Sequence, residues 1–144
     1  MKKQIYFIIT MVVFTATISF MSSCKKEDEM KPPTIQFKTG GLYTSSDVSL
    51  TAGSPVLAGV IAKKADAESE SEDVLEHFNI SRSLNGGTNV SVYDEDIPQA
   101  MEDEYDNDFA AFVSANPGDV EKYTFTVTNR DGLTAQISIT ITAL

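Results

Sequence analysis

The C-terminal part of the chain contains the pattern that most restricts the fold, a strict alternation of apolar and polar residues. Tyr123, Phe125 and Val127 alternate with threonines, and the alternation resumes over residues 133–141. An Asn-Arg-Asp-Gly stretch at residues 129–132 separates the two runs. A period of two is that of a strand with one buried face, and Asp-Gly favours a tight hairpin turn. We therefore predict a C-terminal hairpin whose threonine-rich face is exposed.

Shorter apolar runs, separated by turn residues, occupy much of the chain upstream. An Asn-Gly-Gly-Thr stretch at residues 85–88 predicts a second hairpin. The run at 56–62 is almost entirely apolar, which indicates a strand buried on both faces or at the centre of a sheet. The predicted upstream strands lie near residues 35–37, 48–50, 56–62, 78–84, 90–92 and 109–113. About seven short strands predict an all-β fold, an antiparallel β-sandwich.

The C-terminal hairpin resembles the last two strands of bacterial immunoglobulin-like and cadherin-like modules. In those modules an aromatic residue in a Thr/Val-rich strand precedes an Asp-Gly turn and a strand of alternating Ile and Thr, as in residues 123–142 here. The resemblance implies an immunoglobulin-like sandwich over residues 34–144, and it implies a fold rather than a function. The chain has no tryptophan and a single cysteine, which excludes an antibody-type core.

The N-terminus has the layout of a secretory leader. Lys2 and Lys3 precede residues 5–21, which carry no charge and are mostly apolar. A basic start followed by an apolar stretch is typical of a signal peptide. The alternative is a membrane-spanning helix, but a span needs about 20 apolar residues, and this run is shorter and interrupted by Thr and Ser. We predict that residues 1–23 form a cleaved signal peptide.

Cys24, the only cysteine, follows the leader directly. Ser22 and Ser23 before it resemble the lipobox of bacterial lipoproteins, although Met21 stands where that family usually has Leu. The resemblance implies that the Cys24 thiol carries a diacylglycerol and its amino group a further acyl chain such as palmitate. Two or three chains anchor firmly, at about 0.8 kcal/mol per buried methylene group. The alternative is an ordinary free thiol. Residues 24–33 would then form a lipidated tether.

The residues after Cys24 form a second candidate targeting signal. The Lys-Lys-Glu-Asp-Glu run at residues 25–29 resembles the export signal of surface lipoproteins in the Bacteroidetes. The resemblance implies lipid anchoring in the outer membrane, at the cell surface; a solvated tether is the alternative. Pro32 and Pro33 form a stiff extended spacer, so we expect the folded domain to begin at residue 34.

The charge balance restricts the partners. The formal net charge is −10, and removing Lys2 and Lys3 with the leader makes it −12. Such a chain repels nucleic acid, so we expect no nucleic-acid partner. The partners that remain open are the membrane, through the lipid anchor, and a protein or glycan ligand. A glycan platform would need exposed aromatic rings. Tyr43, Tyr93 and Tyr105 are the only candidates, and a packing or turn position explains each of them better.

Residue types suited to catalysis are scarce. His77 is the only histidine, and its phase relative to Phe78 and Ile80 predicts an exposed strand position. With Cys24 committed to lipid, neither a nucleophile triad nor a zinc site is supported. We therefore predict no enzyme and no catalytic residues, but an adhesion, ligand-binding or accessory module. The alternatives are a calcium-binding cadherin-like module and an accessory glycan-binding protein of an uptake system. A small hydrolase stays open as an alternative that would need two carboxyl groups in one pocket.

Two acidic clusters, at residues 94–96 and 102–108, are the one feature of the sequence that suggests a bound cofactor. Calcium takes six to eight oxygen ligands, and cadherin-like modules use acidic loops in this way. Residues 66–73 are predicted to be a loop, and residues 99–108 a helical turn at most. The predicted calcium ligands are Asp94, Asp96, Asp106 and Asp108. The alternative is that both clusters are solvated loops that keep the domain soluble; no other cofactor is expected.

Overall fold

The structure, a computed structural model, describes residues 31–65 and 73–144. The predicted signal peptide, Cys24, most of the tether and most of the charged segment 66–73 lie outside the described residues. The described chain forms eight strands and one short 3-10 helix, η1. These are β1 (Thr34–Phe37), β2 (Val48–Leu50), β3 (Pro55–Lys63), β4 (Leu75–Leu84), β5 (Val90–Asp96), η1 (Gln99–Met101), β6 (Glu104–Phe112), β7 (Val120–Asn129) and β8 (Thr134–Ala143).

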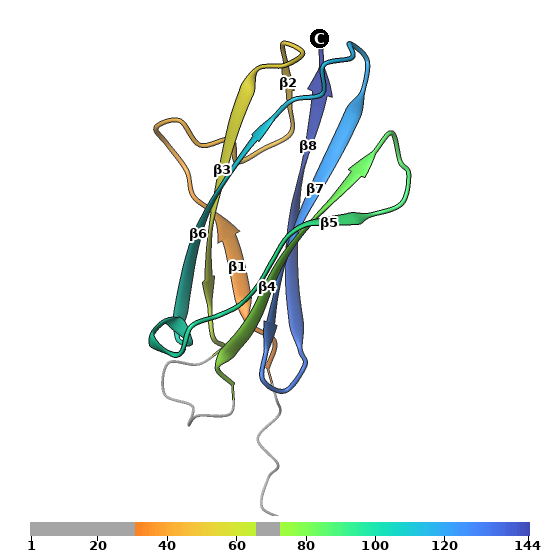
Figure 1. Cartoon of the computed structure of the whole chain (residues 1–144). Helices are drawn as coiled ribbons and strands as arrows, with labels where there is room; N and C mark the ends of the chain where they lie inside the picture. Colours follow the sequence, from red (N-terminus) through yellow and green to blue (C-terminus); the bar gives the residue numbers. More distant parts are fainter. Residues whose placement is uncertain (1–30, 66–72) are drawn as a thin grey trace, which may run out of the picture.

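The strands form two sheets that face each other, as Figure 1 shows. One sheet has the order β1-β3-β6 and the other the order β2-β8-β7-β4-β5. The predicted all-β sandwich is confirmed. The apolar run at 56–62 lies in β3, at the centre of the three-stranded sheet, as predicted.

Both predicted hairpins are present. In the C-terminal hairpin, β7 pairs with β8 without interruption from Val120–Thr142 to Thr128–Thr134. The turn is closed by Gly132 N–H donating to Asn129 O at 3.0 Å. In the second hairpin, Asn85 and Gly86 both have positive φ, of 52° and 72°. Positive φ at two successive turn residues matches the right-handed twist of the strands, which explains the Asn-Gly pair at this turn.

One pairing differs from the predicted antiparallel arrangement. β2 pairs with β8 in parallel, with Val48 opposite Ile141 and Leu50 opposite Ala143. β1 belongs to the other sheet, so the chain crosses between sheets after β1 and enters the second sheet in the direction of β8. A hairpin from β1 would have forced antiparallel pairing, and the crossing connection over residues 38–47 removes that constraint.

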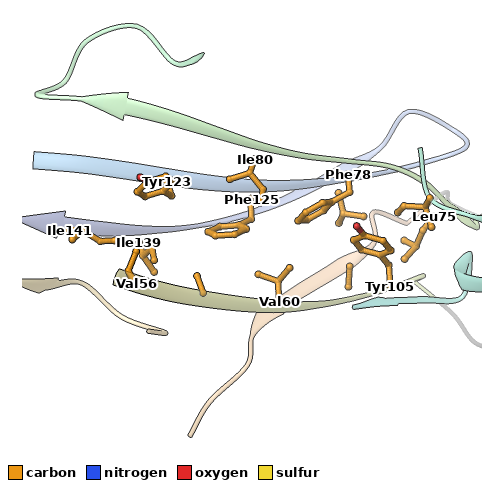
Figure 2. Close-up of a cluster of buried hydrophobic side chains, with 14 of the residues drawn as sticks. Val56, Val60, Leu75, Phe78, Ile80, Tyr105, Tyr123, Phe125, Ile139 and Ile141 are labelled. Atoms are coloured by element: carbon orange, nitrogen blue, oxygen red, sulfur yellow. The ribbon is translucent and has the colours of Figure 1, made fainter. Parts of the chain in front are cut away.

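The core lies between the inward faces of both sheets (Figure 2). β7 contributes Tyr123, Phe125 and Val127, and β3 contributes small or branched residues such as Val60. The Phe125 ring contacts the Phe37 ring edge-on, with centroids 5.5 Å apart. Alternation along each strand therefore supplies one continuous apolar layer, as the sequence pattern requires.

Both acidic clusters lie largely in strands, which corrects the prediction that they form loops. Asp94 and Asp96 belong to β5, and Asp106 and Asp108 belong to β6. Only η1 and the residues around it have the predicted helical-turn character. The acids occupy outward positions of alternating strands, so their charges stay in solvent while the residues between them face inward. Residues 104–112 alternate between more exposed and more buried positions, although the charge density of the segment favours a loop.

The two ends of the described chain lie at opposite ends of the sandwich (Figure 1). Lys31 O accepts a hydrogen bond from Asn129 Nδ2 at 3.5 Å, beside the β7–β8 turn. Leu144 N donates to Leu50 O at the other end. We call the end beside Lys31 the tether end and the opposite end, with the β4–β5 turn, the distal end.

Candidate functional site

One narrow side of the sandwich concentrates negative charge. It is formed by the edge strands β5 and β6 and the connection between them, and we call it the acidic edge. The acidic edge consists of Asp94, Glu95, Asp96, Glu102, Asp103, Glu104, Asp106 and Asp108. No Lys or Arg occurs between Arg82 and Lys122, so every counterion must come from another part of the chain.

Asp106 and Asp108 share one lysine on the outer face of the three-stranded sheet. Lys38 Nζ lies 2.7 Å from Asp108 Oδ1 and also binds Asp106. The Tyr43 hydroxyl donates to Asp108 Oδ2 at 2.9 Å. Burial would lower the pKa of Lys38, but its hydrogen bonds to both carboxylates outweigh this and raise the pKa above its usual range. The hydrogen bond from Lys38 lowers the pKa of Asp108.

Gly59 makes room for this cluster. A Cβ at Gly59 would lie 2.6 Å from Lys38 Cδ and 2.7 Å from the Tyr43 ring. Both side chains therefore cross the sheet directly above the glycine, which explains a glycine in the middle of a buried strand.

Asp94 and Asp96 flank His77 on the outer face of the five-stranded sheet. His77 Nδ1 lies 3.0 Å from Asp96 Oδ1, and Nε2 lies 3.3 Å from Asp94 Oδ1. Asn79 Nδ2 donates to Asp94 Oδ2 at 2.7 Å. A ring with a carboxylate at each nitrogen is best satisfied when both nitrogens carry protons, and the hydrogen bond with Asp96 raises the pKa of His77. The side chain lies out of phase with the buried Phe78 and Ile80, as predicted, and is partly exposed.

We expect the His77→Gln substitution to destabilise the fold most at low pH. Because the pKa of His77 is raised on folding, its stabilising contribution is complete below the unfolded pKa, about 6.5, and is lost as pH rises through the folded value. Urea unfolding between about pH 5.5 and about pH 9 should show the difference in unfolding free energy shrinking as pH rises. His77→Lys, which stays charged, is the control and should show little of this dependence. A difference that grows with pH would contradict the assignment.

Glu95 lies on the inner side of β5 and joins the two edge strands. Its two carboxylate oxygens accept hydrogen bonds from the Tyr93 and Tyr105 hydroxyls. Asn107 Nδ2 donates to Tyr105 Oη at 3.1 Å. The hydrogen bond from Tyr105, then that from Tyr93, lowers the pKa of Glu95, and burial raises the pKa of Tyr105. These hydrogen bonds connect β5 to β6 across the acidic edge. The only sequence signal for this cluster is that Glu95 alternates with Asp94 and Asp96.

The tyrosines proposed for a glycan platform are separated by this arrangement. Tyr105 is 2% exposed and belongs to the core. Tyr93 is half-buried, with its ring edge-on to Phe78. Tyr43 lies on the outer face of the other sheet, with Lys38 Nζ 5.5 Å from its ring centroid. The three rings form no shared exposed surface.

The four predicted calcium ligands are also divided. Asp94 and Asp96 surround His77 on one outer face, whereas Asp106 and Asp108 surround Lys38 on the other. Among residues 31–65 and 73–144, no group of three or more His, Cys, Asp or Glu side chains is arranged to hold a metal ion. Calcium binding stays a prediction, and a bound ion would have to displace His77 or Lys38 from its carboxylate partners.

A shallow hollow lies beside β2. It is lined by Asp47, Val48, Ser49, Thr140 and Thr142. Asp47 Oδ1 accepts a hydrogen bond from Thr140 N at 2.7 Å, so the single carboxylate there holds the β2 segment to β8. The two carboxyl groups that a hydrolase would need are not brought together in this hollow.

Large apolar side chains are exposed in the half of the sandwich away from the tether end. Phe112, at the end of β6, is 72% exposed. The set consists of Leu42, Leu84, Val90, Val92, Phe112, Val120 and Leu144. The register places Val120 opposite Thr142 and Phe112 opposite Pro55, at the ends of strands that run to the distal end. Their exposure depends on which strands end without a covering neighbour, which alternation alone does not reveal.

Comparisons with known proteins do not assign the chain to a family. No known family profile and no curated protein matches the chain. A solved structure similar to it is Spo0M, a sporulation control protein from Bacillus subtilis, with 8% sequence identity, a TM-score of 0.43 and 79% of this chain covered. The chain spans 51% of the length of that structure. Within the described residues, no helix is long and apolar enough to cross a membrane.

Proposed function

We propose that this protein is a lipid-anchored lipoprotein of the outer membrane, displayed at the cell surface as a non-enzymatic adhesion, ligand-binding or accessory module. The observation that carries the proposal is the difference between the two ends of the domain. The chain enters at the tether end, and the exposed large apolar side chains lie in the opposite half. Large exposed apolar residues on a secreted domain favour contact with another molecule.

The tether joins the domain in a defined way. Pro33 is buried, and Lys31 O is bound to Asn129 at the base of the β7–β8 hairpin. β7 has ten residues, so the distal end lies roughly 30 Å from the point of entry. With Cys24 lipidated, this geometry would hold the apolar residues away from the membrane surface.

The strand order supports an immunoglobulin-like type of sandwich. In immunoglobulin domains the last two strands pair with the third strand of the fold in one sheet, and variable-type domains add a further strand beyond it. The order β8-β7-β4-β5 corresponds to that sheet, and β3-β6 corresponds to the core of the other. The fold presents loops and edges on a rigid scaffold, which suits a binding module.

Cys24→Ser is expected to move the protein from the membrane fraction to the soluble fraction, because the serine hydroxyl does not receive the lipid and the anchor is lost. Fractionation with immunoblotting measures this, and protease treatment of intact cells measures surface exposure of the wild type. Ser22→Ala keeps a small residue before Cys24 and serves as the matched control. Membrane retention of Cys24→Ser would contradict the anchor, and protection of the wild type from protease would contradict surface display.

A further inference from the structure

We propose that the free edge of β6 binds an extended polypeptide segment of alternating basic and apolar residues, which joins the three-stranded sheet as an added strand. The inference deepens the proposed function by naming the kind of partner that a binding module of this shape would take. It rests on the backbone geometry of β6, on the charge of the acidic edge and on the apolar side chains beside it.

β6 differs from the other edge strands. β1 has four residues and β2 has three, so neither offers a long template. β5 is interrupted by a register shift opposite Ile80 and Ser81. β6 pairs with β3 over nine residues without a shift, and it contains no proline and no lysine. Short length, bulges, proline and charged side chains are the means by which edge strands avoid pairing. Of these β6 has only charge, from Glu104, Asp106 and Asp108, and negative charge disfavours an acidic partner strand but not a basic one.

The backbone of β6 leaves alternate groups unpaired. Val113 N donates to Ser54 O at 2.9 Å, so the backbone N–H and C=O groups of the odd-numbered residues in this segment point toward β3. In an antiparallel ladder the direction alternates, and the even-numbered residues therefore direct N–H and C=O away from β3. Within the described part of the chain, no backbone partner meets Asp106, Asp108, Ala110 or Phe112 on that side. These groups are a template for strand addition.

The charge of the acidic edge favours a basic segment. Its eight carboxylates are matched by four basic side chains, Lys38, Lys63, Lys64 and Arg130, which leaves a net charge of −4. His77 offsets one further charge when protonated. Asp106 and Asp108, on the outer face of β6, remain about half exposed despite Lys38. Basic side chains of an added strand would lie beside them, whereas a second copy of β6 would bring like charges together.

The other face of an added strand would meet apolar side chains. Phe109 and Ala111 point inward from β6, are only partly buried, and pack against the core. Inward-facing side chains of an added strand would extend the core over Phe109 and Ala111. Phe112 lies on the outer face of β6, where it offers an apolar contact at the distal end. Basic residues on one face and apolar residues on the other is the pattern that fits both sides of this edge.

The test uses the full chain, purified in a non-ionic detergent, and a capped octapeptide of alternating Lys and Val as probe. Titration calorimetry measures affinity, and amide hydrogen exchange locates the bound strand. We expect exchange at Asp108 and Ala110 to slow on binding. A block octapeptide, four Lys followed by four Val, has the same charge and composition and is the peptide control.

Ala110→Pro removes one edge N–H without touching a hydrogen bond to β3, because proline is tolerated where the N–H faces solvent. It should weaken binding by about tenfold or more through the lost hydrogen bond and the ring in its path. Ala110→Val keeps the N–H and should bind as the wild type does.

Equal binding of the block peptide, equal binding by Ala110→Pro, or no slowing of exchange in β6 of the wild type would each overturn the proposal. The exchange measurement needs no variant, so it decides the matter even if Ala110→Pro misfolds. Surface display is tested separately through Cys24, so the two proposals can fail independently.

Discussion

Replacing Glu121 with alanine is expected to lower the free energy of unfolding by about 3 kcal/mol. Glu121 is 1% exposed and accepts hydrogen bonds from Arg82 Nε at 2.9 Å and from Ser114 N at 2.8 Å. Removing it leaves Arg82 without its carboxylate and the Ser114 amide without its acceptor. Because Arg82 is partly exposed, water can recover some of the loss, which places the effect at the low end for a buried pair. Urea unfolding measures the change.

The double variant Arg82→Met/Glu121→Leu separates pairing from packing. Replacing both partners by apolar residues removes the desolvation cost along with the attraction, so we expect stability within about 1 kcal/mol of the wild type. Lys122→Ala, on the exposed face of the same strand, is the surface control and should change stability by less than about 0.5 kcal/mol. If Glu121→Ala were as stable as Lys122→Ala, the buried pair would have no role in holding the β4–β7 pairing.

Phe125→Ala should cost about 3–5 kcal/mol, the largest loss expected from any single substitution discussed. The Phe125 side chain is fully buried, and its ring lies edge-on to Phe37 and to Phe109, with centroids 5.5 Å and 6.2 Å away. Those two rings belong to β1 and β6, so Phe125 joins its own sheet to both edges of the other. Denaturant unfolding followed by far-UV circular dichroism would measure the loss.

Phe125→Leu is the graded comparison. It keeps an apolar side chain of similar reach but loses the edge-on ring contacts, so its cost should be clearly smaller than that of alanine. Equal losses for leucine and alanine would mean that ring geometry, rather than buried volume, determines the stability at this position. A small loss for both would contradict the central place of Phe125 in the core.

The hairpins were predictable because local information is sufficient for them. The alternation in residues 123–141 fixes which face of each strand is buried, and the Asp-Gly and Asn-Gly turns set the register. In the acidic segments the charge density favours a loop and the periodicity favours a strand, and the structure follows the periodicity. In β6, Tyr105, Asn107 and Phe109 alternate with acids, and that alternation describes the strand correctly.

The acidic edge could be predicted only in part. The acids were visible, but their partners come from distant positions, since Lys38 lies 70 residues from Asp108 and His77 lies 19 residues from Asp96. The burial of Glu121 had one sequence signal, which is that Glu121 lies in phase with the inward-facing Tyr123 and Phe125. Its ionic partner Arg82 lies in phase with the inward-facing Phe78 and Ile80 of β4. Residue types alone do not reveal which acid meets which base.

The sequence by itself determined the class of fold, the two hairpins and the buried faces of their strands, because these follow from alternation and turn chemistry between neighbours. Only the tertiary structure decided the parallel β2–β8 pairing, the division of the predicted calcium ligands between two outer faces, and the free edge of β6. Each of these depends on which strands become neighbours across the two sheets. That choice is made by packing between segments far apart in the chain, and no local pattern encodes it.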